Sequence, residues 1–229
     1  MTLHRFFVPP DDVRGDAFPI PPAIERQVRT VLRLGDGDRI ALLDGGGSEI
    51  VCRLSDGRCE VEERREVMSE PSHRLTVVQA LLKGDALEEV VQHGTEVGVA
   101  AFRLVVSERC VAREISPRKL ERLRTIAREA AEQSERGVVP PVEEPIQLAE
   151  ALERGSVLLY ERYDGPGLSV LEPPAAVIVG PEGGFTPGEV AAALAAGVVV
   201  AGLGRRILRS ETVAVAAGAV ILSRAGDFA

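Results

Sequence analysis

The chain has 229 residues, of which 45% are apolar and 27% are charged. This length is enough for one large globular domain or two modest ones, each with a hydrophobic core. The formal net charge of −8 argues against a protein that coats nucleic acid nonspecifically, because such binding depends on neutralising phosphates. The apolar stretches are interrupted well before the roughly 20 residues that a membrane span needs, so we expect no membrane partner.

The cysteines and histidines do not form a metal-binding pattern. Cys52, Cys59 and Cys110 are odd in number and widely spaced, and the three histidines form no constellation with them. We therefore predict no metal site and expect the cysteines to be reduced and buried as small apolar groups. The first residues also lack the apolar core and cleavage site of a signal peptide. These features favour a cytoplasmic location.

Residues 1–68 read as a small β-rich domain. A short strand is expected at residues 4–8, and a helix at residues 22–34 that ends at Gly35. Residues 38–43 and 49–54 are two apolar runs separated by a glycine-rich turn, which is the pattern of a hairpin. Another strand is expected at residues 58–67. A small barrel is the simplest closure of these strands.

A polar, proline-containing stretch at residues 68–72 is the predicted domain boundary. In residues 72–229, strands and helices alternate, which favours one α/β domain with a mostly parallel sheet. Strands are expected at residues 75–81, 101–106, 156–160, 175–179 and 198–201, and helices at residues 86–97, 117–136, 146–153, 187–196 and 213–223.

Two glycine-rich loops follow two of the predicted strands, at residues 180–184 and 202–204. Open α/β sheets bind ligands at the carboxyl ends of their strands, and backbone without side chains can approach a flat aromatic ligand. Glycines at strand ends can also serve only as turns. A dinucleotide fingerprint is disfavoured, because Ile207 replaces its third glycine and no later strand supplies the ribose-binding acid. Neither loop continues into the Gly-Lys-Ser/Thr of a phosphate-binding P-loop.

The two loops, at this order and spacing, resemble the RsmE family of SPOUT-class RNA methyltransferases. The motifs are Val179-Gly180-Pro181-Glu182-Gly183-Gly184-Phe185 and Leu203-Gly204-Arg205-Arg206-Ile207-Leu208-Arg209-Ser210-Glu211-Thr212-Val213-Ala214. The likeness extends to the N-terminal His4-Arg5-Phe6-Phe7-Val8 and to Lys83-Gly84-Asp85. Two departures are His93, where the family pattern has lysine, and Ser210-Glu211-Thr212-Val213, where it has Thr-Glu-Thr-Ala.

The resemblance implies a trefoil-knotted SPOUT domain at residues 72–229, preceded by a PUA-like RNA-binding barrel at residues 1–68. It also implies that the protein methylates N3 of a uridine in 16S ribosomal RNA, with S-adenosylmethionine as the methyl donor and the assembled small subunit as the substrate. A homodimer is implied as well. Methylation of another RNA nucleoside, and a noncatalytic role in ribosome assembly, remain as alternatives.

By resemblance, residues of three strand-end segments bind the methyl donor. They are Leu159, Tyr160, Glu161, Gly180, Pro181, Glu182, Gly183, Gly184, Leu203, Gly204, Ile207, Leu208 and Thr212. Arg209 is the candidate for stabilising the uracil oxygens, although it could instead bind only phosphate. Glu211 is the candidate for removing the N3 proton, although it could instead only anchor the last helix.

Residues that could contact RNA lie in both parts of the chain. They are His4, Arg5, Arg33, Gln133, Ser134, Arg136, Arg205 and Arg206. Arginine suits this task because its guanidinium binds phosphate with two hydrogen bonds and stacks on bases. His4 and Arg5 could also serve only solubility, and residues 133–136 could only terminate the long helix that precedes them.

Overall fold

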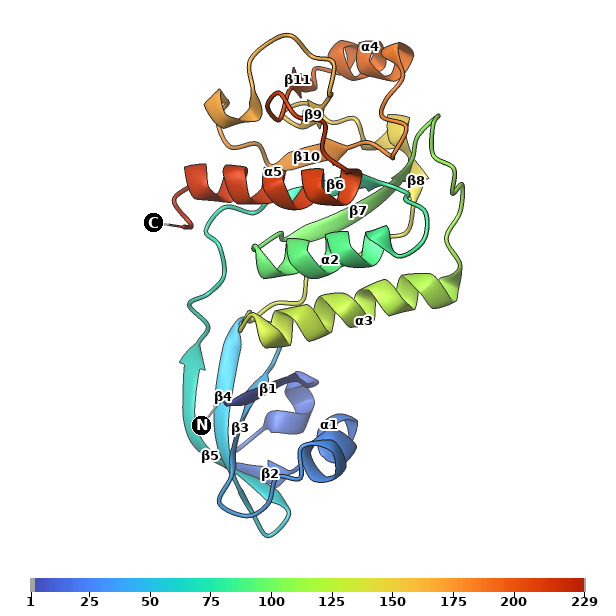
Figure 1. The fold of residues 1–229 in the computed structure, drawn as a ribbon. Coiled ribbons are helices and arrows are strands. Elements are labelled where there is room, and N and C mark those ends of the chain that lie inside the picture. The colour runs from blue at the N-terminus through green and yellow to red at the C-terminus, as the bar shows by residue number, and fades with distance from the viewer. Residues whose placement is uncertain (1–2, 229) are drawn as a thin grey trace. The chain divides into compact units, whose positions relative to one another are not determined.

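The computed structural model describes residues 3–228, which divide into two compact units (Figure 1). The first unit comprises the chain up to Glu70 together with Ala131–Val139, and the second comprises Pro71–Ala130 and the chain from Pro140 onward. The segment Ala131–Val139 therefore belongs to the first unit, whereas the sequence pattern placed it with residues 72–229.

The first unit is built on a five-stranded sheet. Its strands are β1 (His4–Phe7), β2 (Ala17–Pro19), β3 (Arg39–Leu43), β4 (Ser48–Ser55) and β5 (Arg58–Glu66), in the spatial order β1-β3-β4-β5-β2. The predicted hairpin is present as the antiparallel pair β3 and β4. The pairings within residues 3–228 leave β1 and β2 as the two edges of this sheet.

The helix predicted at residues 22–34 is shorter than expected. It consists of α1 (Pro22–Arg26) and a π-helical turn η2 (Gln27–Val31), in which the N–H of Leu32 donates to the carbonyl of Gln27. Arg33 then adopts a φ of +56°, in the left-handed region, and this ends the helix before Gly35. A 3-10 turn, η1 (Pro10–Val13), precedes β2.

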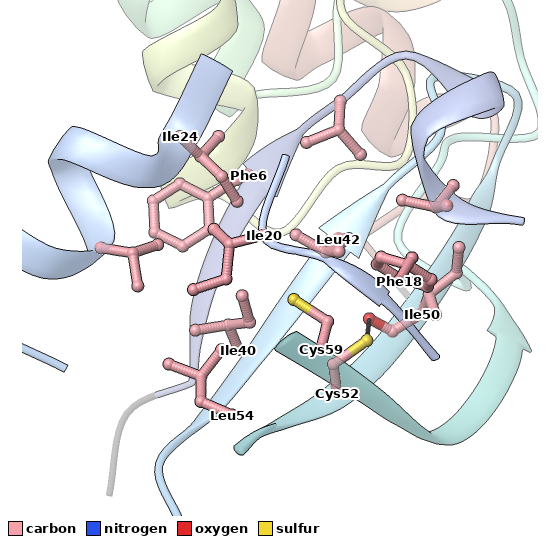
Figure 2. Close-up of a cluster of buried hydrophobic side chains, with 13 residues drawn as sticks. Phe6, Phe18, Ile20, Ile24, Ile40, Leu42, Ile50, Cys52, Leu54 and Cys59 are labelled. Atoms are coloured by element: carbon pink, nitrogen blue, oxygen red, sulfur yellow. Dashed lines mark hydrogen bonds between the residues drawn. The ribbon is translucent and has the colours of Figure 1, made fainter. Parts of the chain in front are cut away.

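The core of the first unit contains two of the three cysteines. Figure 2 shows Cys52 of β4 and Cys59 of β5 among aliphatic and aromatic side chains such as Phe6 and Leu42, and all four are at most 2% exposed. A hydrogen bond with the Cys59 thiol, and burial, raise the pKa of Cys52. All three cysteines are free and buried, as the sequence predicted.

The second unit is an α/β structure with a six-stranded parallel sheet, which confirms the α/β class predicted for this part of the chain. The strands are β6 (Thr76–Ala80), β7 (Ala101–Val106), β8 (Ile146–Gln147), β9 (Val157–Leu159), β10 (Ala176–Val179) and β11 (Val199–Ala201), in the order β11-β9-β10-β6-β7-β8. The helices are α2 (Ala86–Glu96), α3 (Pro117–Gln133), whose last residues belong to the first unit, α4 (Pro187–Ala195) and α5 (Ser210–Arg224). No helix within residues 3–228 is long and apolar enough to cross a membrane.

Three elements predicted within residues 72–229 differ in the structure. The helix expected at residues 146–153 is replaced by strand β8 and a 3-10 turn η3 (Leu148–Ala151), because Ile146 pairs with Val105 of β7. The long helix α3 ends at Gln133 rather than at Arg136. The last helix begins at Ser210, so that the glutamate and threonine that follow belong to its first turn.

The sheet order brings three sequence segments to one edge. Strand β9 lies between β11 and β10, and all three strands run parallel. Their carboxyl ends therefore meet at the same edge of the sheet, where open α/β sheets bind ligands. The helices α2 and α5 pack against each other, and α5 also packs on β6 and β10 (Figure 1).

Candidate functional site

A cavity of about 770 Å³ lies at this edge of the second unit. It is lined by residues from the ends of β9, β10 and β11, from the start of α5 and from Ala86 at the start of α2. The predicted donor-binding residues that line it are Leu159, Tyr160, Glu161, Gly180, Pro181, Glu182, Gly183, Gly184, Leu203, Gly204, Ile207 and Leu208. The three segments that the resemblance brought together thus form one cavity.

Thr212 is the predicted donor-binding residue that does not line this cavity. Ser210 is buried, and the next buried residue of α5 is Ala214, one turn later. Thr212 lies between them on the opposite side of the helix and is exposed. Helix α5 begins earlier than predicted, and its helical geometry places Thr212 on the side that faces away from the cavity.

The second glycine loop offers unpaired backbone groups to the cavity. For residues 203–208, no hydrogen bond links a backbone N–H or C=O group to any other described part of the chain. Several of these residues line the cavity, and Gly204 has a φ of +89°. Backbone groups at the wall of a pocket need partners from a ligand or from water. The loop can therefore read the polar edge of a flat ligand, as its composition predicted.

Side chains from elsewhere in the second unit hold the first glycine loop in place. Arg109 donates from Nη1 to the carbonyl oxygens of Gly183 (3.0 Å) and Phe185 (3.3 Å). The carboxylate of Glu182 accepts a hydrogen bond from the N–H of Lys83 at 2.9 Å. These contacts fix two carbonyl groups and one carboxylate of the segment at the wall of the cavity.

The start of α4, directly after this loop, has a capping box and further hydrogen bonds with Glu108. Thr186 and Glu189 form a capping box, in which Glu189 Oε2 accepts from the N–H of Thr186 at 2.8 Å. Glu108 adds a second layer, because its carboxylate accepts from Thr186 Oγ1 and its N–H donates to Glu189 Oε1. The loop after β7 therefore anchors the segment that follows the first glycine loop.

The two candidate catalytic residues both line the cavity. Arg209 is the N-cap residue of α5 and is exposed, and no hydrogen bond or ion pair of its guanidinium is found within residues 3–228. Glu211 lies in the first turn of α5, where the helix dipole favours a negative charge. The structure thus brings a cation and a carboxylate to the wall of the same cavity.

The predicted RNA-binding residues are divided between the two units. Arg206 lines the cavity, and Arg205 lies beside it on the same exposed loop. In the first unit, Arg33 is exposed, and His4 is half-buried at the start of β1. Gln133 is exposed and Ser134 half-buried, and both also belong to the first unit.

Two of the predicted RNA-binding arginines are engaged inside the first unit. Arg5 forms ion pairs with Glu49 (2.8 Å) and Glu135 (2.9 Å). Arg136 is 3% exposed, and its guanidinium donates to both carboxylate oxygens of Glu70, at 3.2 and 2.8 Å. These contacts tie the segment after α3 to the rest of the first unit.

Sequence reasoning missed several residues that line the cavity. They are Ala86, Arg162, Val179, Phe185, Ser210 and Val213. The last four lie within the two quoted motifs, but they were not among the residues assigned to the donor. Ala86 gave no signal, because it lines the cavity only through the parallel pairing of β6 with β10. His93 lies on α2, outside the cavity lining, with Nδ1 3.0 Å from Glu96 Oε2.

Comparisons with known proteins agree with this geometry. The family model described as an RNA methyltransferase domain matches residues 69–222. A protein named ribosomal RNA small subunit methyltransferase E from Synechocystis is 34% identical, over 93% of this chain and 75% of that protein. The protein of the same name from Bacillus subtilis is also 34% identical, over 80% of each chain.

Solved structures extend the likeness to the fold. The crystal structure of a ribosomal RNA small subunit methyltransferase E from Neisseria gonorrhoeae, bound to S-adenosyl methionine, superposes with a TM-score of 0.87 at 32% identity and covers 97% of this chain and 98% of that one. A Legionella pneumophila protein in complex with the bound cofactor SAM gives a TM-score of 0.85 at 26% identity, over 97% of this chain and 98% of that one. From its sequence, its fold and the cavity at its two glycine loops, the chain belongs to the ribosomal RNA small subunit methyltransferase E family, the RsmE family.

Proposed function

We propose that this protein transfers the methyl group of S-adenosylmethionine to N3 of a uridine in 16S ribosomal RNA. The observation that carries this proposal is the cavity in which two glycine-rich loops meet under the N-cap of α5, with Arg209 and Glu211 in its wall. Membership in the RsmE family and the donor bound in a solved relative support the same reading. The substrate is the small ribosomal subunit in assembled form.

The residues of the cavity fit the donor. Gly184 lines the cavity at a φ of +66°, and a Cβ built on it would lie 2.9 Å from Glu161 Oε1, so that a large side chain at this position would enter the cavity. Leu159, Leu203 and Leu208 supply apolar wall, and the unpaired backbone of residues 203–208 supplies polar groups for an adenine edge. A mostly apolar pocket with a few directed polar groups is typical of cofactor sites.

When bound, S-adenosylmethionine supplies a methyl group on a positively charged sulfur. Transfer forms the bond from uracil N3 to the methyl carbon, breaks the bond from that carbon to sulfur, and releases the N3 proton. The loops of this chain hold the two reactants close together and in line, and this orientation accounts for much of the acceleration of methyl transfer. Arg209 faces the negative charge that develops on the uracil oxygens, and Glu211 accepts the N3 proton.

Further parts of the proposal concern the assembly. We propose that residues 72–229 form a SPOUT trefoil knot and that residues 1–68 form a PUA-like RNA-binding module. In the first unit, we propose His4, Arg33, Gln133 and Ser134 as RNA contacts. We also propose a cytoplasmic homodimer. The homodimer is supported by half-buried apolar residues along α5, including Val215 and Val220, which a second copy of the chain would cover.

The proposal is tested by incubating the purified protein with small ribosomal subunits and isotope-labelled S-adenosylmethionine. We expect label in 16S RNA and, after nuclease digestion, 3-methyluridine by mass spectrometry. Naked 16S RNA is the comparison for the assembled subunit. Another labelled nucleoside would correct the acceptor, whereas binding to subunits without any transfer of label would favour a noncatalytic assembly protein.

The role of Glu211 as proton acceptor is tested by Glu211→Gln, which keeps the size of the side chain and removes its basicity. We expect kcat to fall about 100-fold, in the range typical of general-base removal, with an unchanged dissociation constant for S-adenosylhomocysteine. The control is Glu89→Gln, since Glu89 is also an acid in the first turn of its helix, α2, but is exposed and lies outside the cavity lining. A loss of thermal stability with unchanged kcat would instead assign Glu211 to anchoring α5.

A further inference from the structure

A buried amide lies beneath the cavity and is connected to its wall. Gln79 of β6 is 0% exposed and pairs in register with Val179, the last residue of β10. Its Nε2 donates to the carbonyl of Ala80 and to Ser210 Oγ, both at 3.0 Å. Ser210 Oγ in turn donates to the carbonyl of Gly180 at 2.5 Å. The chain of bonds therefore links β6, the first residue of α5 and the start of the first glycine loop.

The direction of this chain of bonds is fixed. A backbone carbonyl only accepts, so Ala80 requires the Nε2 side of the amide rather than Oε1 to face it. Ser210 Oγ must then accept from Nε2, which leaves its one proton for Gly180. The carbonyl of Gly180 is thereby held at the point where β10 turns into the loop. Ser210 and Gly180 both line the cavity, whereas Gln79 does not.

The arrangement carries a cost. Gln79 Oε1 is buried and has no hydrogen-bond partner in the described structure. An unsatisfied buried acceptor destabilises the folded state, and an apolar side chain of similar volume would avoid that penalty. The Gln79 amide uses its Nε2 group to bond Ser210 in the cavity wall and leaves Oε1 without a partner. Its role in positioning Ser210 therefore explains this buried amide better than core packing does.

We propose that Gln79 is a positioning residue that acts through Ser210 on the methyl-donor site. The relay fixes the carbonyl of Gly180 and with it the path of residues 180–184 along the cavity. This inference rests on the proposed function, because the ligand whose binding it controls is S-adenosylmethionine. Threonine carries the same hydroxyl as serine, so that Ser210→Thr would keep the relay.

The test measures the dissociation constant of S-adenosylhomocysteine by calorimetry, and the melting temperature, for Gln79→Met, Ser210→Ala, Ser210→Thr and the double variant Gln79→Met with Ser210→Ala. We expect each disruptive single variant to weaken binding about tenfold and the double variant to be no weaker than either, because the two residues act as one relay. Ser210→Thr should bind within about threefold of wild type.

A matched control is Ser156→Ala, which removes the hydroxyl of a serine that is 4% exposed at the opposite, amino end of β9. It should leave the dissociation constant unchanged. Lower melting temperatures with unchanged binding in the relay variants would overturn the inference and leave Gln79 a core residue. If Gln79→Met does not fold, Gln79→Leu, which also removes the hydrogen bond to Ser210 Oγ, decides between these outcomes. Absence of binding by the wild type would overturn the proposed function and, with it, this inference.

Discussion

Replacing Gly184 with tryptophan is expected to abolish binding of S-adenosylhomocysteine, with the dissociation constant raised at least 100-fold. A side chain on Gly184 would start 2.9 Å from the Glu161 carboxylate, and both residues line the cavity. The indole would therefore occupy space that the ligand needs. Calorimetric titration of the purified protein measures the effect directly, independently of any RNA substrate.

Two controls separate filling of the cavity from backbone strain. Gly184→Ala has the same φ of +66° but adds only a methyl group, and the nearest atoms belong to the flexible end of Glu161. We expect it to cost about 1–2 kcal/mol of stability and to keep measurable binding. Gly226→Trp adds an indole at another glycine of positive φ, in the open and remote from the cavity, and should bind as wild type does. Full binding by Gly184→Trp would place the donor elsewhere.

Replacing Arg209 with alanine is expected to lower kcat by about 100- to 1,000-fold, the range found when one donor to a developing negative charge is removed. Binding of S-adenosylhomocysteine should change little, because Arg209 is proposed to contact the uracil oxygens and not the methyl donor or its product. Arg209→Lys should recover part of the activity, since a lysine ammonium keeps the charge but not the planar fork of donors. Single-turnover rates with small ribosomal subunits measure the chemical step.

The matched control for Arg209 is Arg205→Ala, because Arg205 lies on the same exposed loop but does not line the cavity. If Arg209 binds only phosphate, its variant should raise the KM for the subunit and leave kcat intact, as the Arg205 variant should. If it faces the uracil oxygens, kcat falls and the salt dependence of KM stays as in wild type. The split between kcat and KM therefore distinguishes the two roles that the sequence left open.

The fold of the second unit was largely readable from the sequence because its signals are local. The buried strands of the parallel sheet are short apolar runs, and the Thr186-Pro187-Gly188-Glu189 start of α4 carries its own capping box. The errors came where a distant partner decided the conformation. Residues 146–147 form a strand because β7 lies beside them, and a local pattern of apolar residues does not reveal this.

The sequence by itself determined the α/β class of the second unit, the two glycine loops and the residues of those loops that line the cavity. Glycines after apolar runs are recognisable one segment at a time, and parallel strands bring their carboxyl ends to one edge. Only the tertiary structure decided which side chains hold the first loop, since Arg109 and Ser210 reach it across 74 and 30 positions of sequence. Gln79 in turn reaches Ser210 across 131 positions. It also decided that Arg136 is buried against Glu70, because a charge pattern does not specify which partner a charge finds.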